Sequence, residues 1–173
     1  KAAADPTSPS YQPAIGQFRD GAKIKADMPS FFAVGAQYSP IERLRINAGY
    51  HVYGDKNASQ YGNKQDLIDD NTWEITSGVE FDIIERLTAS VGFQTTQYGF
   101  SDANMNDLSF STSSNSYGCG FRVGLTKHAT LDVSYMKTVY KDRTVATQTE
   151  AGQKLDTYSR DNRVFGVGVN LTF

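Results

Sequence analysis

The chain has 173 residues, and its 17 lysines and arginines nearly balance its 19 aspartates and glutamates, so the composition gives no basis for a nucleic-acid partner. A single cysteine excludes an internal disulfide framework. The longest unbroken apolar runs are only a few residues, far short of the ~20 residues that a transmembrane helix needs.

Apolar residues alternate with small or polar residues in seven segments, and strict alternation is typical of a strand with one apolar face. In the last segment, every odd position from Phe165 to Phe173 is apolar. An apolar band of four or five residues on one face takes about nine residues of strand, which roughly spans a bilayer when tilted by about 45°. In chain order, the predicted strands cover residues 32–38, 44–52, 73–81, 87–93, 117–125, 131–139 and 165–173.

The connections between the predicted strands alternate between short and long. The short ones cover residues 39–43, 82–86 and 126–128, and the long, polar ones cover residues 54–71, 99–115 and 141–161. Short periplasmic turns and long extracellular loops are the pattern of outer-membrane barrels. Aromatic residues near the strand ends fit the interfacial girdles of such proteins, and they are Tyr38, Tyr53, Trp73, Phe81, Tyr98, Tyr117, Tyr140 and Phe173.

We therefore predict an all-β fold, an antiparallel transmembrane β-barrel of the bacterial outer membrane. Residues 1–27 are expected to form an extracellular-side loop or partial strand, and residues 28–173 the C-terminal strands of the barrel. Bacterial single-chain barrels usually have an even number of strands, so seven predicts part of a larger barrel. A soluble up-and-down barrel would show the same alternation turned inside out, but the loop asymmetry and the terminal Phe173 favour the membrane protein.

The start of the chain carries no signal peptide, because its first residues lack an apolar core. An outer-membrane protein is exported with such a peptide, so we expect the start to have been processed or cut.

Several segments resemble the C-terminal half of the outer-membrane long-chain fatty-acid transporter (FadL-type) family. Residues 20–29 end in Met28-Pro29 and lead into the alternating strand 32–38. A turn and a strand that opens with Arg43-Leu44-Arg45 follow, and Arg86-Leu87-Thr88 opens a similar strand after the next turn. The pattern continues at residues 131–135, and the resemblance covers residues 20–173.

This resemblance implies a 14-stranded barrel of which the chain forms about half. It also implies passive uptake of hydrophobic molecules such as long-chain fatty acids, with the ligand held in the lumen and released sideways into the bilayer. The family's plug and wall opening belong to the other half. Some relatives of this fold serve protein secretion, so a secretion-system accessory or a structural outer-membrane protein is the alternative function.

The inward face of the predicted strands holds the candidate ligand contacts. A ligand carboxylate could pair with Arg45 or Arg122, because arginine presents a bidentate fork. Alternatively the inward charges pair with one another, for example Arg122 with Glu80 or Asp132, and fill the lumen. The lumen candidates are Phe31, Arg45, His51, Tyr53, Arg122, Met136 and Tyr140, and the predicted charge network adds Glu74, Glu80 and Asp132.

Other features of the sequence favour structural roles. The inward glycines could leave room for a plug or a ligand, or they could relieve strand coiling and curvature, and most of them are interpreted in the second way. Cys119 falls on the outward face, where a small lipid-facing residue is expected. The acidic clusters at Asp66, Asp69 and Asp70 and at residues 102–107 are interpreted as solvated loops, so neither a metal nor another cofactor is expected.

We do not expect an enzyme, because His51 and His128 are the only histidines and no serine motif accompanies them. The expected partners are membrane lipid, a hydrophobic small molecule and the barrel assembly machinery, which would bind the strand that ends at Phe173. Other outer-membrane proteins are further candidate partners.

Overall fold

The computed structural model describes residues 23, 27–59, 68–102, 105, 110–149 and 152–172. Nine strands and one short 3₁₀ helix, η3 (Asp55–Asn57), make up the regular structure of this part of the chain. The strands are β1 (Phe31–Ile41), β2 (Leu44–Tyr53), β3 (Thr72–Ile84), β4 (Leu87–Gln97), β5 (Ser114–Gly124), β6 (Ala129–Tyr140), β7 (Arg143–Thr149), β8 (Gly152–Tyr158) and β9 (Asp161–Leu171).

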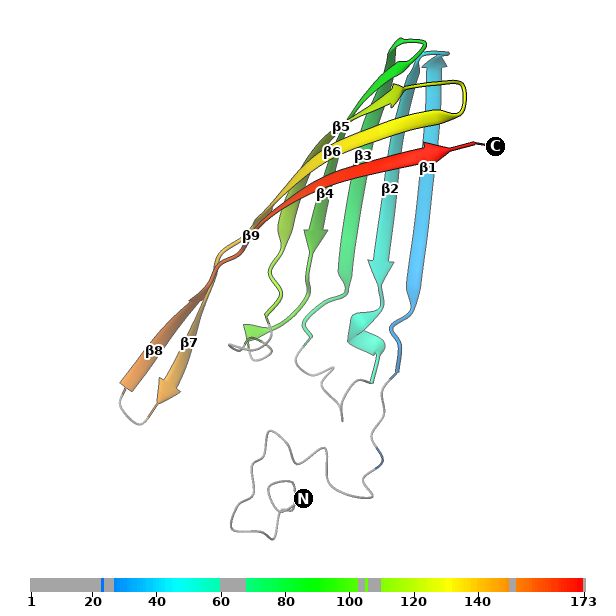
Figure 1. The fold of residues 1–173 in the computed structure, drawn as a ribbon. Coiled ribbons are helices and arrows are strands. Elements are labelled where there is room, and N and C mark those ends of the chain that lie inside the picture. Colours follow the sequence, from blue (N-terminus) through cyan, green and yellow to red (C-terminus); the bar gives the residue numbers. More distant parts are fainter. Residues whose placement is uncertain are drawn as a thin grey trace.

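Seven of these strands form one antiparallel sheet in the order β1-β2-β3-β4-β5-β6-β9 (Figure 1). Each strand pairs with the next one in the chain, except that β6 pairs with β9 because β7 and β8 lie outside this sheet. All seven predicted strands are confirmed, and most of them extend beyond their predicted limits. β3 has 13 residues, which at about 3.3 Å per residue and a tilt of about 45° reach roughly 30 Å, the thickness of a bilayer's hydrocarbon core. The fold is thus an all-β, antiparallel barrel segment, as predicted.

The expected long loop at residues 141–161 contains structure that the sequence analysis missed. β7 and β8 pair with each other in a separate hairpin, which continues outward from the ends of β6 and β9 (Figure 1). Alternation failed to reveal it because both faces of β8 are largely exposed, and Leu155 is 65% exposed. Gly152 opens β8 with a φ of +119°, a conformation that only glycine adopts readily.

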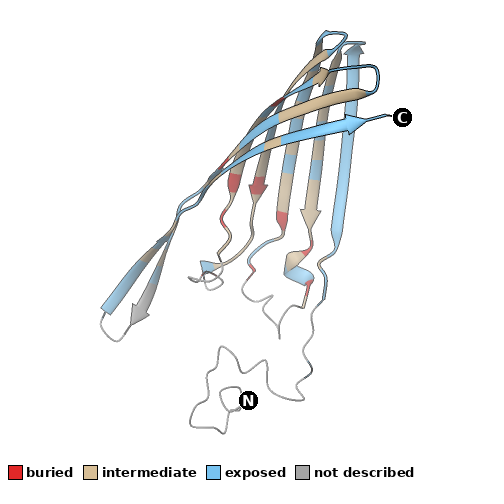
Figure 2. Ribbon diagram, in the orientation of Figure 1, coloured by how far each residue is buried: buried red, intermediate tan, exposed pale blue. Residues whose placement is uncertain are grey.

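The sheet has two chemically different faces, set by the alternation along each strand. The apolar face is strongly exposed: Val91 is 60% exposed, Phe165 69% and Val167 63%. Buried positions are confined mainly to short stretches near the long-loop ends of the strands (Figure 2). Exposed apolar surface of this extent requires lipid or another protein to cover it.

The two edges of the sheet, β1 and β9, pair with no further strand among the described residues. Pro40 lies in β1, where the register with β2 shifts between Tyr38 and Ile41, and an edge strand tolerates a residue without an N–H donor. In the described ranges, no helix is both long enough and apolar enough to cross a membrane. Phe173 and the predicted N-terminal segment 1–27, apart from Lys23 and Asp27, lie outside the described residues.

Candidate functional site

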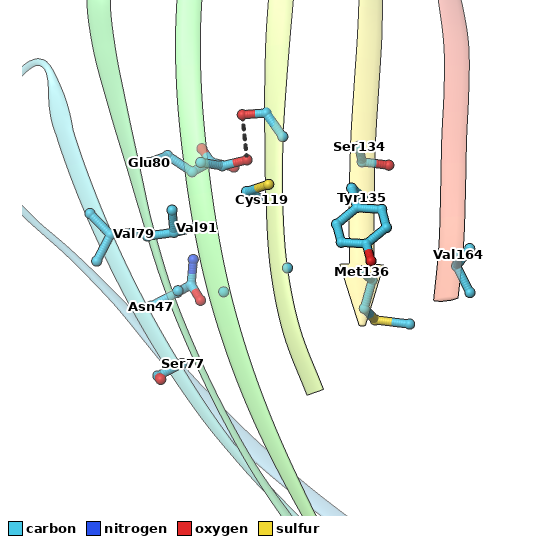
Figure 3. A pocket seen from close by; sticks show the side chains of 15 residues that line it. Asn47, Ser77, Val79, Glu80, Val91, Cys119, Ser134, Tyr135, Met136 and Val164 are labelled. Atoms are coloured by element: carbon cyan, nitrogen blue, oxygen red, sulfur yellow. Dashed lines mark hydrogen bonds between the residues drawn. The ribbon is translucent and has the colours of Figure 1, made fainter. Parts of the chain in front are cut away.

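The inner face of the sheet, opposite the apolar one, contains a hollow of about 480 Å³ at mid-height. Its floor is a row of three glycines, because Gly78 faces Gly92 in the β3–β4 register and Gly92 faces Gly118 in the β4–β5 register. Asn47 lies at the β2 side of this row, and Met136 and Val164 lie at the β6–β9 side (Figure 3). Met136 and Val164 face each other in the register and form an apolar patch at one end of the hollow.

Packing within the chain does not require glycine at two of these floor positions. A Cβ added to Gly92 would meet only the backbone oxygen of Ser77 at 3.7 Å, and one added to Gly118 only that of Tyr135 at 3.6 Å, which are ordinary contacts. Gly78 differs, because a Cβ there would lie 2.8 Å from Oδ1 of Asn47. Close packing therefore does not explain the whole row, and Gly92 and Gly118 leave open space on the inner face.

A charged network lies on the inner face at the short-turn end of the sheet. The Arg45 guanidinium donates to Glu80 through Nε at 2.9 Å and to both oxygens of Asp82 through Nη1 and Nη2, each at 2.8 Å. Thr88 also donates to Asp82, at 2.7 Å. All these groups have partners inside the chain.

Arg122 forms a second ion pair at the same end of the inner face. Its Nε donates to Asp132 at 2.7 Å across the β5–β6 register, and Asn170 donates to the other oxygen of Asp132 at 2.7 Å. The structure thus pairs Arg122 with Asp132, the second of the two partners considered from the sequence, while Glu80 pairs with Arg45. Neither arginine presents a guanidinium free of carboxylates to a ligand.

A second network lies toward the long-loop end, with Glu74 at its centre. Gln94 Nε2 and Thr96 Oγ1 donate to Oε1 of Glu74 at 3.0 and 2.9 Å, and the Tyr53 hydroxyl donates to Oε2 at 3.3 Å. His51 Nδ1 lies 3.4 Å from the same Oε2. The ring of Phe31 contacts this group from β1, with its centroid 4.9 Å from that of Tyr53 and 5.6 Å from that of His51.

Beyond this network, a mouth cluster lies where β4, β6 and β9 meet the long connections, and it consists of Tyr98, Phe110, Ser111, Thr112, Tyr140 and Arg160. Arg160 lies over the Tyr140 ring, with its guanidinium carbon 5.1 Å from the ring centroid, a cation–π contact. Burial raises the pKa of the Tyr98 phenol, so this group stays protonated and can donate. The Thr112 hydroxyl is buried and has no hydrogen-bond partner among the described residues.

The structure divides the predicted lumen residues among these regions. Arg45, Arg122, Glu80 and Asp132 lie at the short-turn end, and Phe31, His51, Tyr53 and Glu74 lie together at the long-loop end. Met136 lines the hollow, and Tyr140 belongs to the mouth cluster. No group of three or more acidic, histidine or cysteine side chains in the described residues is placed to hold a metal ion.

Sequence reasoning missed several residues of these regions. Asp82 was assigned to a turn, although β3 continues through it, and Arg160 was assigned to a loop. The even-numbered residues of β9 face inward, and the same alternation, continued to the residue before the strand, predicts that Arg160 lies on the inner face. No sequence signal marked the alignment of Gly78, Gly92 and Gly118, because their meeting depends on the strand register.

The fold has a counterpart among solved structures. The chain matches the crystal structure of a Pseudomonas aeruginosa FadL homologue with a TM-score of 0.63 and 18% sequence identity. The match covers 83% of this chain and 35% of that one, so the matched part is about a third of the length of the homologue. No protein-family model and no curated protein matches the sequence.

This similarity shows the fold alone, because a sequence identity of 18% is too low to support a statement about function. The seven-stranded sheet of this chain has the fold of a section of a FadL-like barrel wall. In such a section the exposed apolar face lies on the outside of the barrel, and the hollow and the two polar networks lie on the inside.

Proposed function

We propose that this chain forms part of the wall of a bacterial outer-membrane channel for passive uptake of hydrophobic molecules such as long-chain fatty acids. The ligand occupies the lumen and leaves sideways into the bilayer. The observation that carries this proposal is the hollow floored by Gly78, Gly92 and Gly118, since packing within the chain leaves the space above Gly92 and Gly118 open. The FadL-like fold supports the same reading.

The distribution of charge on the inner face suits a largely apolar ligand. Arg45 and Arg122 are neutralised by carboxylates of the same sheet, so neither demands a charged partner. Met136 and Val164, which are 38% and 44% exposed, offer apolar contacts beside the hollow. An acyl chain that lies across Gly92 and Gly118 would gain contact with this patch as it leaves water.

We assign the polar end of the ligand to Arg160 rather than to Arg45 or Arg122. The described residues place no carboxylate in an ion pair with Arg160, and the Tyr140 ring beneath it holds its guanidinium in position. The unpartnered Thr112 hydroxyl and the protonated Tyr98 phenol add two donors to the same small cavity. A carboxylate bound there would complete its hydrogen bonds with these groups.

Native mass spectrometry of the full-length, detergent-extracted protein tests this function, with gentle and then harsh activation. We expect gentle activation to preserve complexes with ligands of fatty-acid size and harsh activation to release them. In parallel, cells that lack their own fatty-acid channel should take up labelled oleate when they express the protein. A protein without lipid ligand that fails to restore uptake, or one that co-purifies with a protein translocon instead, would contradict the proposal.

A further inference from the structure

Two cations face each other directly on the outward face of the sheet. Lys137 of β6 is the register partner of Arg163 of β9. The neighbouring register pair, Met136 and Val164, lines the inner hollow. Because successive side chains of a strand point to opposite faces, Lys137 and Arg163 point to the outward face. The Arg163 side chain is 66% exposed.

This arrangement is the opposite of what the inner face shows. There Arg45 faces Glu80 and Arg122 faces Asp132 across their strand pairs. Like charges that lie directly opposite on neighbouring strands destabilise a sheet. The Lys137–Arg163 pair has little internal compensation, because Asp161 lies 3.5 Å from Arg163 at an exposed position and Lys137 forms no ion pair with the described residues.

The pair lies near the boundary of the apolar belt, on the long-loop side, where the next outward pair is Val139 and the charged Asp161. Toward the short turns, the next outward pair is Tyr135 and Phe165, and further apolar residues follow on both strands. On the other side of Lys137, its β5 register partner is Tyr117, whose ring centroid lies 5.4 Å from that of Phe93. An aromatic girdle and basic side chains at one level mark the interface between lipid tails and head groups.

We propose that Lys137 and Arg163 form a binding site for the phosphate group of a membrane lipid in the leaflet on the long-loop side, with Tyr117 against the lipid beside them. Phosphate neutralises both cations, the guanidinium supplies a fork of donors, and the ammonium adds a compact charge. In an outer membrane the lipid of this leaflet is a phosphorylated glycolipid, so the phosphate is lipid-borne. The site rests on the membrane location in the proposed function but not on the transport activity.

The test uses the full-length protein in a neutral detergent, with bisphosphorylated lipid A as the probe and native mass spectrometry as the readout. We expect lipid A to bind the wild-type protein, and the double variant Lys137→Gln/Arg163→Gln to bind it on the order of 30-fold more weakly, as the removal of two cations beside a lipid phosphate predicts. The control variant Arg43→Gln/Lys127→Gln removes the same charge from the short-turn end and should bind as the wild type does. Inorganic phosphate at equal concentration should leave the lipid complex intact.

Thermal unfolding separates this site from cations that merely extend into solvent. Without lipid, the double variant should unfold at a temperature no lower than the wild type, because the repulsion is gone. With lipid A, only the wild type and the control should gain stability, since ligand binding to the folded state raises the unfolding temperature. Equal lipid A binding by the double variant and the wild type would overturn the site, whereas failure to enter membranes or to take up oleate would instead count against the proposed function.

Discussion

Arg45 holds Asp82 in a bidentate ion pair, with Nη1 and Nη2 each 2.8 Å from a different carboxylate oxygen. The register partner of Arg45 is Glu80, so the guanidinium reaches its own partner through Nε and the next inward residue through its two terminal nitrogens. Three hydrogen bonds to two carboxylates occupy most of its donors. Arg45 therefore joins β2 to β3 at the short-turn end of the sheet.

Replacing Arg45 by leucine should destabilise the barrel more than replacing Arg122 by leucine. Arg45→Leu removes the cation from two carboxylates, whereas Arg122→Leu removes it from Asp132 alone, which keeps the Asn170 amide. The shift of the folded band on unheated electrophoresis gels, followed as a function of temperature, ranks the two variants. Oleate uptake well below both unfolding temperatures should stay within about twofold of the wild-type rate, because the proposed ligand site includes neither residue. A large loss of uptake at an unchanged unfolding temperature would instead make Arg45 a ligand contact.

The Glu74 network makes a second prediction about stability. Glu74→Leu leaves the Tyr53 hydroxyl and the buried Thr96 hydroxyl without their acceptor, while the Gln94 amide keeps a hydrogen bond to Oγ1 of Thr96. We expect a loss of about 1–3 kcal/mol in the free energy of unfolding by urea in lipid vesicles, the range for an orphaned polar group. Glu74→Gln keeps an acceptor oxygen and should lose clearly less. Equal losses for the two variants would mean that the network adds nothing beyond side-chain volume.

The sequence predicted the strands well because each one has an apolar face and a small or polar face, and this imposes a period of two on residues such as Phe165, Val167 and Val169. The β7–β8 hairpin lacks that constraint, so Leu155 stands alone among polar neighbours and no period marks the strand. The same alternation placed Arg45, Glu74 and Asp132 on one face. It could not tell which charges meet, because that depends on register and on reach along the sheet, as the contact of Arg45 with Asp82 shows.

The mouth cluster could not be predicted for a different reason. Arg160 lies outside any strand, and Thr112 belongs to a connection whose path the alternation does not constrain. Their meeting at Tyr140 depends on how β6 and β9 leave the sheet to form the hairpin. Long-range contacts between irregular segments leave no periodic signal in a single sequence.

Filling the hollow should block uptake without unfolding the barrel. At Gly92 and Gly118 a side chain meets only ordinary contacts at its base, so Gly92→Leu and Gly118→Leu should fold. Their side chains would occupy the hollow and should lower oleate uptake by about tenfold, because they fill space proposed for the ligand and a loss of about 1.4 kcal/mol in binding is tenfold. Gly92→Ala should lie between these variants and the wild type. The outward substitution Ala89→Leu, on the same strand but outside the hollow, should leave uptake unchanged, and an equal loss from Ala89→Leu and Gly92→Leu would show that the hollow does not hold the ligand.

Arg143 should help to anchor the β7–β8 hairpin at its base, beside the contact between the rings of Phe110 and Tyr158. Arg143 donates through Nε to Asp102 and through Nη1 to the backbone oxygen of Phe100, each at 2.7 Å, and so ties β7 to the connection between β4 and β5. Arg143→Ala should raise amide hydrogen exchange in β7 and β8 by about tenfold, as the loss of charge-assisted hydrogen bonds predicts. The sheet of β1–β6 and β9 should exchange as before. As a control, Lys154→Ala removes an ion pair with Asp156 inside the hairpin and should have a smaller effect.

Arg160 should decide whether the channel prefers a charged head group. The proposed contact predicts that the wild-type protein binds oleate more tightly than methyl oleate, which has the same chain but no charge. Arg160→Gln should reduce the ratio of oleate affinity to methyl oleate affinity about tenfold, the amount expected when one charge-assisted hydrogen bond is lost. It should leave methyl oleate binding nearly unchanged. Tyr140→Leu removes the ring on which the guanidinium lies and should weaken oleate binding by a smaller factor. Arg163→Gln is the matched control, because it removes the same charge three residues away on the outward face and should alter neither affinity. If Arg160→Gln and Arg163→Gln weaken oleate binding equally, the effect comes from the general field of the protein, and the head group binds elsewhere in the lumen.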